Sequence, residues 1–336
     1  MSKERITGEE AIIQSFLAPL AASYPGAYGL KDDCAAFSPS PGHDLVVKTD
    51  PVAEGVHFFA DDRPDDIGWK ALAVNVSDLA AKAAVPRAYL MALSFPEAPT
   101  RDWMRGFAEG LADAQAAFGM HLIGGDTDKR PGPITISITV FGEVTAGRMV
   151  RRATAKAGDS IYVTGVLGAG ATGLALRQRP DLATAWGLTE TASAAVLGAY
   201  LRPQPRLAIR DSLLMHASAA MDLSDGLAKD LGRMCKASGC GAHVRARDIP
   251  LAEATRRAIA RDTGRWTDAI ASGDDYEILA AVPPERETAF ASMAAAAGGG
   301  RFGVTRIGTF TTTLDMQIEA VDGTSFNFSR TGWDHF

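Results

Sequence analysis

One short stretch, residues 220–227, places three oxygen-bearing side chains where an apolar run stops and an amphipathic run begins. These side chains are Asp222, Ser224 and Asp225. Residues 218–221 are typical of the end of a buried strand, and residues 227–236 have the apolar spacing of a helix. Asp and Ser at such a junction can cap the helix, because its first amides have no acceptor within it. Taken alone, the stretch therefore favours a helix cap.

Three further stretches, residues 31–34, 48–50 and 124–127, also place an aspartate at the edge of an apolar or glycine-rich segment. Capping would explain each of Asp32, Asp50 and Asp126 separately, but not why so many element ends carry one. Two carboxylates ~4 Å apart repel by roughly 4 kcal/mol at an effective dielectric near 20, so several in one pocket need cations between them. Mg²⁺ takes oxygen ligands and substrate phosphates. The pattern favours a shared multi-metal phosphate site.

Length and composition limit the classes of protein to which the chain can belong. At 336 residues it is long for one core, so we expect two domains, 1–146 and 147–336. The formal net charge of −6 disfavours a nucleic-acid partner, which would require a basic face. The cysteines, Cys34, Cys235 and Cys240, lack metal-ligand spacing, and their odd number argues against a disulfide framework.

No apolar segment of the chain has the character of a signal or a membrane span. Residues 1–10 are charged and lack the apolar core of a signal peptide. No apolar run reaches the ~18 residues that a membrane span needs. We therefore expect a soluble, cytoplasmic protein without a membrane partner.

Hydrophobic periodicity predicts helices and strands throughout the chain. In the first half, helices are expected at 9–20, 67–84 and 101–118, and strands at 44–50, 88–95, 121–123 and 134–140. In the second half, strands are expected at 158–165, 218–221, 240–244, 276–282, 303–309 and 313–318, and one long helix at 177–201. On the helix at 67–84, Asn75 and Asp78 share a stripe and should project together, among Ala and Val neighbours.

A glycine run at residues 165–170 precedes a predicted helix at 171–177. Bare amides and the helix dipole at such a position attract phosphate. The run lacks the Gly-Lys-Ser/Thr of a Walker A loop and the spacing of a dinucleotide-binding loop. A phosphate site and a tight turn required for packing are equally compatible with this run.

Taken together, the motifs resemble those of the thiamine-monophosphate kinase family, within the superfamily of aminoimidazole ribonucleotide synthetase, selenophosphate synthetase and a hydrogenase-maturation protein. The resemblance covers nearly the whole chain, in order. Its motifs are Asp32-Asp-Cys-Ala35, Thr49-Asp50 with Glu54-Gly-Val-His-Phe58, Gly68–Ala81, Ile123-Gly-Gly-Asp-Thr127, Lys156-Ala-Gly-Asp159 with Tyr162-Val-Thr-Gly165, Ala220–Leu227, Gly273-Asp-Asp-Tyr-Glu277 and Gly332-Trp-Asp-His-Phe336.

The resemblance implies an architecture and an activity. It implies an N-terminal α/β domain whose mixed sheet pairs with that of a second subunit in an intersubunit β-barrel, and a C-terminal α+β domain that closes over the nucleotide. The implied reaction is direct in-line transfer of the ATP γ-phosphoryl group to thiamine monophosphate, which gives thiamine diphosphate with the help of several Mg²⁺ ions. It also implies a homodimer, and we place the apolar face of Ile134, Ile136, Ile138 and Val140 at its interface.

The resemblance also implies roles for individual residues, and it assigns no general base. Implied metal ligands are Asp32, Thr49, Asp50, Asp78, Asp126, Asp222 and Asp225. Implied nucleotide contacts are Gly125, Asp126, Arg152 and Ser224, and implied contacts to the thiamine moiety are His57, Asp274 and Trp333. For His57, a hydrogen-bonded loop histidine is the alternative.

The chain departs from the family pattern at four places. Lys31 stands where the family has Gly, Lys48 where it has Ser or Thr, and Lys82-Ala83 where it has Met-Gly; the family's Gly-Gly-Glu-Asp is Ser272-Gly-Asp-Asp275 here. Lys48 lies two residues before Asp50 and should share its face if the strand continues to Asp50. Either the lysines extend outward over apolar surface, or Lys48 and Lys82 supply fixed positive charge that replaces part of a metal's role.

Two alternatives to this kinase stay open at this point. One is another small-molecule ATP-using enzyme of the same superfamily, which His57 and the tail with Trp333 disfavour. The other is a non-catalytic nucleotide-binding relative, which the retention of every aspartate disfavours.

Overall fold

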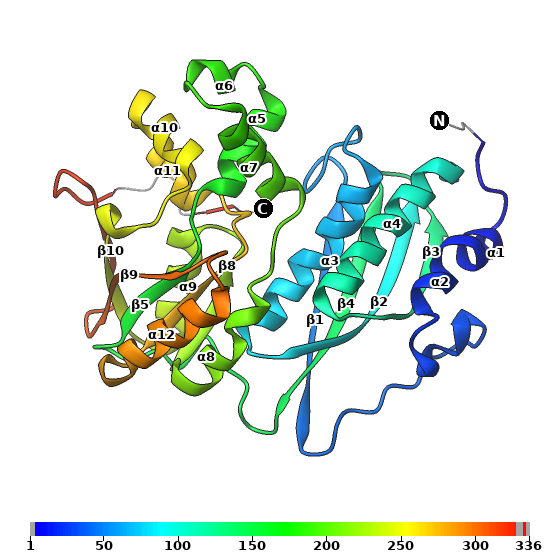
Figure 1. Cartoon of the computed structure of the whole chain (residues 1–336), viewed down its shortest axis with the longest axis horizontal. Helices are drawn as coiled ribbons and strands as arrows, with labels where there is room; N and C mark the ends of the chain where they lie inside the picture. The colour runs from blue at the N-terminus through cyan, green and yellow to red at the C-terminus, as the bar shows by residue number, and fades with distance from the viewer. Residues whose placement is uncertain (1–3, 327–331, 334–336) are drawn as a thin grey trace. The chain divides into compact units, whose positions relative to one another are not determined.

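Two units make up the chain in the computed structural model, which describes residues 4–326 and 332–333 (Figure 1). The first unit comprises Met1–Leu79 with Ala84–Gly147, and the second comprises Ala80–Ala83 with Arg148–Phe336. None of the helices in the described ranges has the length and apolarity that a membrane crossing requires.

The first unit is built on a four-stranded mixed sheet with the strand order β1-β4-β2-β3. Strands β2 and β3 are parallel, and β4 is antiparallel to both β1 and β2. The elements are α1 (Glu9–Ile12), η1 (Ile13–Leu17), α2 (Ala18–Ala21), η2 (Pro25–Leu30), β1 (His43–Ala53), α3 (Pro64–Ala81), β2 (Val85–Phe95), α4 (Arg101–Phe118), β3 (Leu122–Lys129) and β4 (Thr135–Thr145).

Helices α3 and α4 lie over one face of this sheet (Figure 1). Alternate residues of β4, among them Ile136, Ile138 and Val140, are fully buried. Placing this apolar face at a subunit interface was wrong: a strand whose side chains alternate must bury its apolar face somewhere, and here the chain's own helices cover it. The opposite face of β4 carries Ser137, Thr139 and Phe141.

The first strand, β1, continues three residues beyond Asp50, to Ala53, and includes Pro51. A proline inside a strand is tolerated here because β1 is an edge strand, so the missing N–H breaks no second ladder. Val46, Lys48, Asp50 and Val52 alternate on one face, of which Val46 and Val52 are buried. Lys48 and Asp50 therefore share a face, as predicted.

The N-terminal helix predicted at 9–20 forms as a helical run whose middle turn, η1, is a π-helix. Pro19 stands in the first turn of α2, directly after η1. Proline has no amide hydrogen and its ring clashes with the carbonyl four residues earlier, so the wider π-turn accommodates it.

The second unit is built on a six-stranded sheet with the order β10-β7-β9-β5-β8-β6. Only β10 and β7 pair in parallel; the other neighbours are antiparallel. The elements are β5 (Ser160–Thr164), α5 (Ala169–Gln178), α6 (Leu182–Ala185), α7 (Glu190–Leu201), η3 (Leu207–Ile209), α8 (Arg210–His216), β6 (Ala219–Leu223), α9 (Leu227–Ser238), β7 (Gly241–Arg245), η4 (Ala246–Asp248), α10 (Glu253–Arg261), α11 (Arg265–Ala271), β8 (Glu277–Val282), η5 (Pro284–Arg286), α12 (Glu287–Gly298), β9 (Val304–Thr311) and β10 (Met316–Glu319).

Three strands of this second sheet, β5, β6 and β8, are buried on both faces, which explains why they are apolar almost without interruption. In β8, Leu279 and Ala281 pack into a core with α9 and α11, whereas Ile278 and Val282 pack into another with α8 and α12. A third apolar cluster joins α5, α6, α7 and α10.

The continuous helix predicted at 177–201 was wrong. The segment forms the end of α5, then α6, then α7. Pro180 and Gly187 lie in the two breaks, where proline removes a helical hydrogen bond and Gly187 adopts a positive φ of 64°.

Candidate functional site

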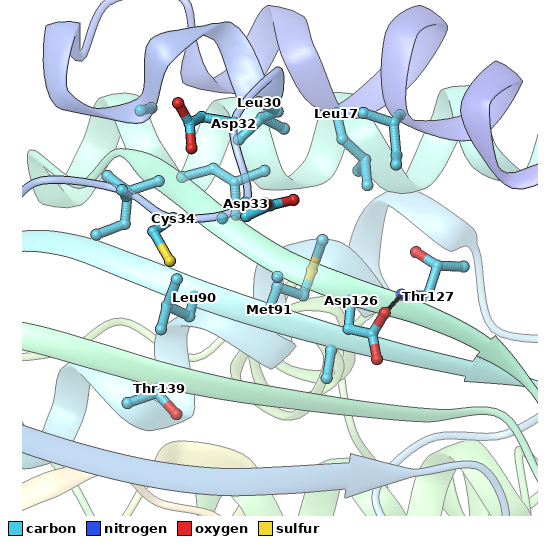
Figure 2. Close-up of a pocket in the computed structure, with 18 of the residues that line it drawn as sticks. Leu17, Leu30, Asp32, Asp33, Cys34, Leu90, Met91, Asp126, Thr127 and Thr139 are labelled. Carbon is cyan, nitrogen blue, oxygen red and sulfur yellow. Dashed lines mark hydrogen bonds between the residues drawn. The ribbon is translucent and has the colours of Figure 1, made fainter.

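A cavity of about 770 Å³ lies in the first unit, on the face of the sheet opposite α3 and α4. Its wall includes Asp32, Asp33, Asp126 and Thr139 (Figure 2). Gly125 also lines it. The side chains of Asp32 and Asp33 project in different directions from the loop after η2 (Figure 2). The carboxylate of Asp126 accepts a hydrogen bond from the amide of Thr127 at 2.9 Å.

Glycine is required at position 125 because β3 approaches β2 closely there. A Cβ atom on Gly125 would lie 1.8 Å from the carbonyl oxygen of Met91. Gly125 is exposed and lines the cavity next to Asp126, so a small polar ligand in the cavity can approach its backbone.

Two threonines connect β1 to the cavity wall. Thr139 donates a hydrogen bond to Thr49 Oγ1 at 3.0 Å, and Thr49 donates to the carbonyl oxygen of Ile138 at 3.2 Å. Thr49 thus lies on the face opposite Asp50, so the structure does not bring the two side chains together. Thr139 and Asp33 were not predicted as site residues; the alternation of β4 was the signal for Thr139.

On the other face of the sheet, Lys48, Asp50, Asn75 and Asp78 form a polar group. The ammonium of Lys48 lies 2.8 Å from Asp50 Oδ2 and 3.0 Å from Asp78 Oδ2. Asn75, which is fully buried, accepts a hydrogen bond from the amide of Asp50 at 2.9 Å. The prediction that Asn75 and Asp78 project together is confirmed: both reach β1, Asn75 at Asp50 and Asp78 at Lys48.

Lys48 is protonated and carries a positive charge. Burial by itself lowers the pKa of its ammonium, but the carboxylates of Asp78 and Asp50 outweigh burial, so the pKa of Lys48 is raised. Lys31, in contrast, is exposed. The ammonium of Lys82, a residue of the second unit, donates to the carbonyl oxygen of Ala220 at 2.8 Å.

His57 lies in the turn that follows β1. Its Nδ1 accepts a hydrogen bond from the amide of Ala53 at 3.0 Å. Acceptance at Nδ1 fixes the neutral tautomer with its hydrogen on Nε2. His57 is therefore a half-buried loop histidine whose Nε2–H is its donor.

In the second unit, the stretch at residues 220–227 crosses from β6 into α9. No side chain in the described part of the chain caps α9 at Gly226, so the capping interpretation of Asp222, Ser224 and Asp225 was wrong. Asp222 is buried within β6, opposite Ile278 of β8. Ser224 is half-buried, and its carbonyl oxygen accepts from the amide of Asp274 at 2.9 Å.

Asp225 is held by the cations of α9. Lys229 Nζ lies 3.5 Å from Asp225 Oδ2, and Arg233 bonds the same oxygen. Arg233 also reaches Asp230 Oδ1 at 3.0 Å, while Asp230 Oδ2 accepts the amide of Asp225 at 2.9 Å. Burial raises the pKa of Asp230 to about 6. This network was not predicted, although Lys229 and Arg233 follow Asp225 at helical spacing, by 4 and 8 positions.

The residues predicted to contact thiamine in the second unit lie around the same stretch. Asp274 has a positive φ of 61°, and its Oδ1 accepts from the hydroxyl of Tyr276 at 3.0 Å. The amide of Trp333 donates to the carbonyl oxygen of Asp225 at 3.1 Å, and its side chain is exposed. Residues 334–336 of the terminal motif lie outside the described residues. Arg152 is exposed, and its carbonyl oxygen accepts from Ser238 at 3.1 Å.

The glycine run at residues 165–170 contacts a buried carboxyl group of the chain. Asp275 accepts hydrogen bonds from the amides of Gly168, at 3.0 Å, and Gly170, at 3.2 Å, at the N-terminus of α5. Burial raises the pKa of Asp275 to about 7. Because a protein carboxylate already occupies these amides, the structure favours the packing turn over a phosphate site.

Among residues 4–326 and 332–333, no three side chains of His, Cys, Asp or Glu are placed to hold a metal ion. The predicted ligands instead lie in separate groups: Asp32 and Asp126 at the cavity, Asp50 and Asp78 around Lys48, and Asp222 and Asp225 in the second unit. Each group consists of carboxylate oxygens, the donors that suit Mg²⁺ when phosphates and waters complete its shell.

Comparisons with known proteins cover nearly the whole chain. The N-terminal domain of AIR synthase related proteins matches residues 31–144, and their C-terminal domain matches residues 156–319. Thiamine-monophosphate kinase of Caulobacter vibrioides is 38% identical over 330 residues, which are 96% of this chain and 89% of that protein.

Solved structures are similar over the same length. Thiamine-monophosphate kinase from Stenotrophomonas maltophilia K279a has a TM-score of 0.83 and 34% identity, and the match covers 96% of this chain and 99% of that one. The structure of AaThiL complexed with AMPPCP and TMP has a TM-score of 0.75 and 28% identity, and the match covers 100% of both chains.

Proposed function

The chain belongs to the thiamine-monophosphate kinase family, and we propose from this membership how its residues serve the reaction. It is an ATP-dependent kinase that phosphorylates thiamine monophosphate to thiamine diphosphate. The single observation that carries this function is the 38% identity to a thiamine-monophosphate kinase over 96% of the chain.

We propose that the γ-phosphoryl group passes directly and in line from ATP to the substrate phosphate. A phosphate acceptor is already ionised, so the reaction needs positioning and charge neutralisation more than a general base. This agrees with the sites described above, which offer carboxylates, ammonium groups and backbone amides. When bound, Mg²⁺ neutralises negative charge on the phosphate oxygens.

In the first unit, Asp32, Asp50, Asp78 and Asp126 are the proposed Mg²⁺ ligands. Asn75 holds the backbone of Asp50 against α3, the helix that also carries Asp78. The hydroxyl of Thr49 lies on the cavity face of the sheet, beside Thr139. We therefore propose that Thr49 assists metal binding on the cavity face, with Asp32 and Asp126. Gly125 is proposed to contact the nucleotide through its bare backbone, and His57 to donate from Nε2 to the substrate.

In the second unit, Asp222 and Asp225 are proposed as metal ligands, Ser224 and Arg152 as nucleotide contacts, and Asp274 and Trp333 as substrate contacts. For four of these residues, what supports the roles is their grouping: the carbonyl oxygen of Ser224 accepts from the amide of Asp274, and that of Asp225 accepts from the amide of Trp333. We propose that residues 1–146 serve metal binding, nucleotide binding and dimerisation, and that residues 147–336 also bind the nucleotide.

We further propose a cytoplasmic homodimer in which the sheets of two first units meet in a barrel. Leu45 and Val47, on the face of β1 opposite Lys48, are 40% and 53% exposed. An edge strand with exposed apolar side chains is suited to pairing with a second copy.

One assay tests the function: the chain is incubated with ATP, Mg²⁺ and thiamine monophosphate, and thiamine diphosphate and ADP are quantified by chromatography. Equal amounts of both products are expected. ADP without thiamine diphosphate would indicate another acceptor. ATP binding without ADP formation would indicate a non-catalytic protein.

A further inference from the structure

The position of Lys48 is unusual because its charge lies between two carboxylates that come from different elements. Its ammonium lies within 3.0 Å of both Asp50 Oδ2, on β1, and Asp78 Oδ2, on α3. Lys48 and Asp50 share a face because they are two residues apart on one strand. Asp78 joins them only because α3 packs on that face.

This arrangement is fixed by its neighbours. Asn75 accepts the amide of Asp50 at 2.9 Å and also donates to the carbonyl oxygen of Ala71 at 3.1 Å, one turn earlier in α3. Asn75 is fully buried, so β1 and α3 are held together by a buried amide directly beside the ion pairs. On the same face of β1, Val46 and Val52 are buried on either side of Lys48 and Asp50.

The geometry points to one cation position between Asp50 and Asp78. A divalent ion that bridged these carboxylates would lie between the same oxygens that Lys48 contacts. The ammonium and such an ion would then be neighbours of like charge, so both cannot occupy the position. Lysine acts on oxyanions as a compact point charge with three donors, which suits it to this position.

We propose that the ammonium of Lys48 takes the place of one divalent cation between Asp50 and Asp78. The chain then carries a permanent single charge where a serine or threonine at position 48 would leave room for an exchangeable ion. This inference rests on the proposed function, because it assumes that Asp50 and Asp78 belong to the metal-binding part of the kinase. It concerns one of the several proposed ions, so both aspartates remain proposed ligands of the others.

The test counts bound Mn²⁺, a probe that prefers oxygen ligands as Mg²⁺ does. Free Mn²⁺ is measured by electron paramagnetic resonance while the full chain is titrated, for the wild type and for Lys48→Ser and Lys48→Gln. We expect each variant to bind one Mn²⁺ more per chain than the wild type. Lys31→Ser, which removes an exposed lysine next to Asp32, is the matched control and should bind as the wild type does.

The extra ion is located with the double variant Lys48→Ser/Asp78→Asn, which should lose it again. Thermal unfolding identifies which of the two Lys48 variants is folded, and the count is made on that one. Equal counts in the wild type and the Lys48 variants would overturn the proposal, as would an extra ion that survives in the double variant.

The count involves neither thiamine monophosphate nor turnover, so the two proposals can fail separately. An extra Mn²⁺ in a chain that forms no thiamine diphosphate would refute the function alone. Equal counts in an active kinase would refute only the inference about Lys48.

Discussion

The side chain of Asp275 accepts a hydrogen bond from the amide of Gly168 at 3.0 Å, although the two residues are 107 positions apart in the sequence. The carboxylate lies at the N-terminus of α5, where a phosphate could otherwise bind. A buried carboxyl and a glycine turn therefore stabilise each other.

The first prediction concerns the pH dependence of stability. Burial raises the pKa of Asp275 from 3.8 to about 7, so the folded chain holds this proton more tightly than the unfolded chain does. The resulting stability is present below pH ~4 and is lost as the pH rises towards 7. Relative to Asp275→Asn, the wild type should lose on the order of 2–4 kcal/mol of unfolding free energy between pH 4.5 and 7.5.

Urea unfolding at several pH values measures this loss. Asp211→Asn, at an exposed position of α8, is the control and should change with pH in parallel with the wild type. The prediction is wrong if the unfolding free energy of the wild type, minus that of Asp275→Asn, stays constant or increases as the pH rises.

The second prediction concerns the ion pair between Arg206 and Glu277. Their side chains are 21% and 3% exposed, and Glu277 Oε2 also accepts from Thr164 at 2.6 Å. Arg206→Ala would leave a buried carboxylate without its cation, so it should cost about 3–5 kcal/mol in urea unfolding.

The control is Arg179→Ala, whose ion pair with Asp181 has side chains 65% and 64% exposed. Exposed pairs contribute about 0–1 kcal/mol, so this variant should unfold almost as the wild type does. Similar losses in the two variants would show that burial of the Arg206 pair is unimportant.

The third prediction concerns turnover. Asp78→Asn removes a proposed metal ligand, and we expect the rate of thiamine diphosphate formation at saturating Mg²⁺ to fall by at least about 100-fold, because charge neutralisation is a large part of phosphoryl transfer. Because Lys48 retains Asp50 as a partner at 2.8 Å, the unfolding free energy should change by only about 1 kcal/mol.

Asp65→Asn, in the first turn of the same helix, is the control and should keep the wild-type rate. Near-normal turnover in Asp78→Asn would remove this residue from the proposed site.

The fourth prediction concerns assembly. If two first units pair through β1, Val47→Lys places a charge in the interface and should halve the mass measured by light scattering at micromolar concentration. Val321→Lys, at an exposed turn of the second unit, should keep the dimer mass. A wild type that is already monomeric would refute the dimer.

Local patterns in the sequence determined much of the secondary structure. The apolar spacing of residues 101–118 predicted α4 with its observed bounds, and the alternation at 134–140 predicted a strand. The stripe with Asn75 and Asp78 was also predictable, because two residues three positions apart on a helix share a face whatever the helix packs against. Likewise, Lys48 and Asp50 had to share a face of any strand that contains both.

The tertiary structure alone decided what each of these faces meets. Alternation shows that Ile136, Ile138 and Val140 point one way, but only packing shows that the chain's own helices cover them. Glycines at 165–170 permit a bare helix N-terminus, but only the fold brings Asp275 there in place of a phosphate. Asp78 meets Lys48 for the same reason: periodicity is local, whereas a partner distant in the sequence is chosen by the packing of whole elements.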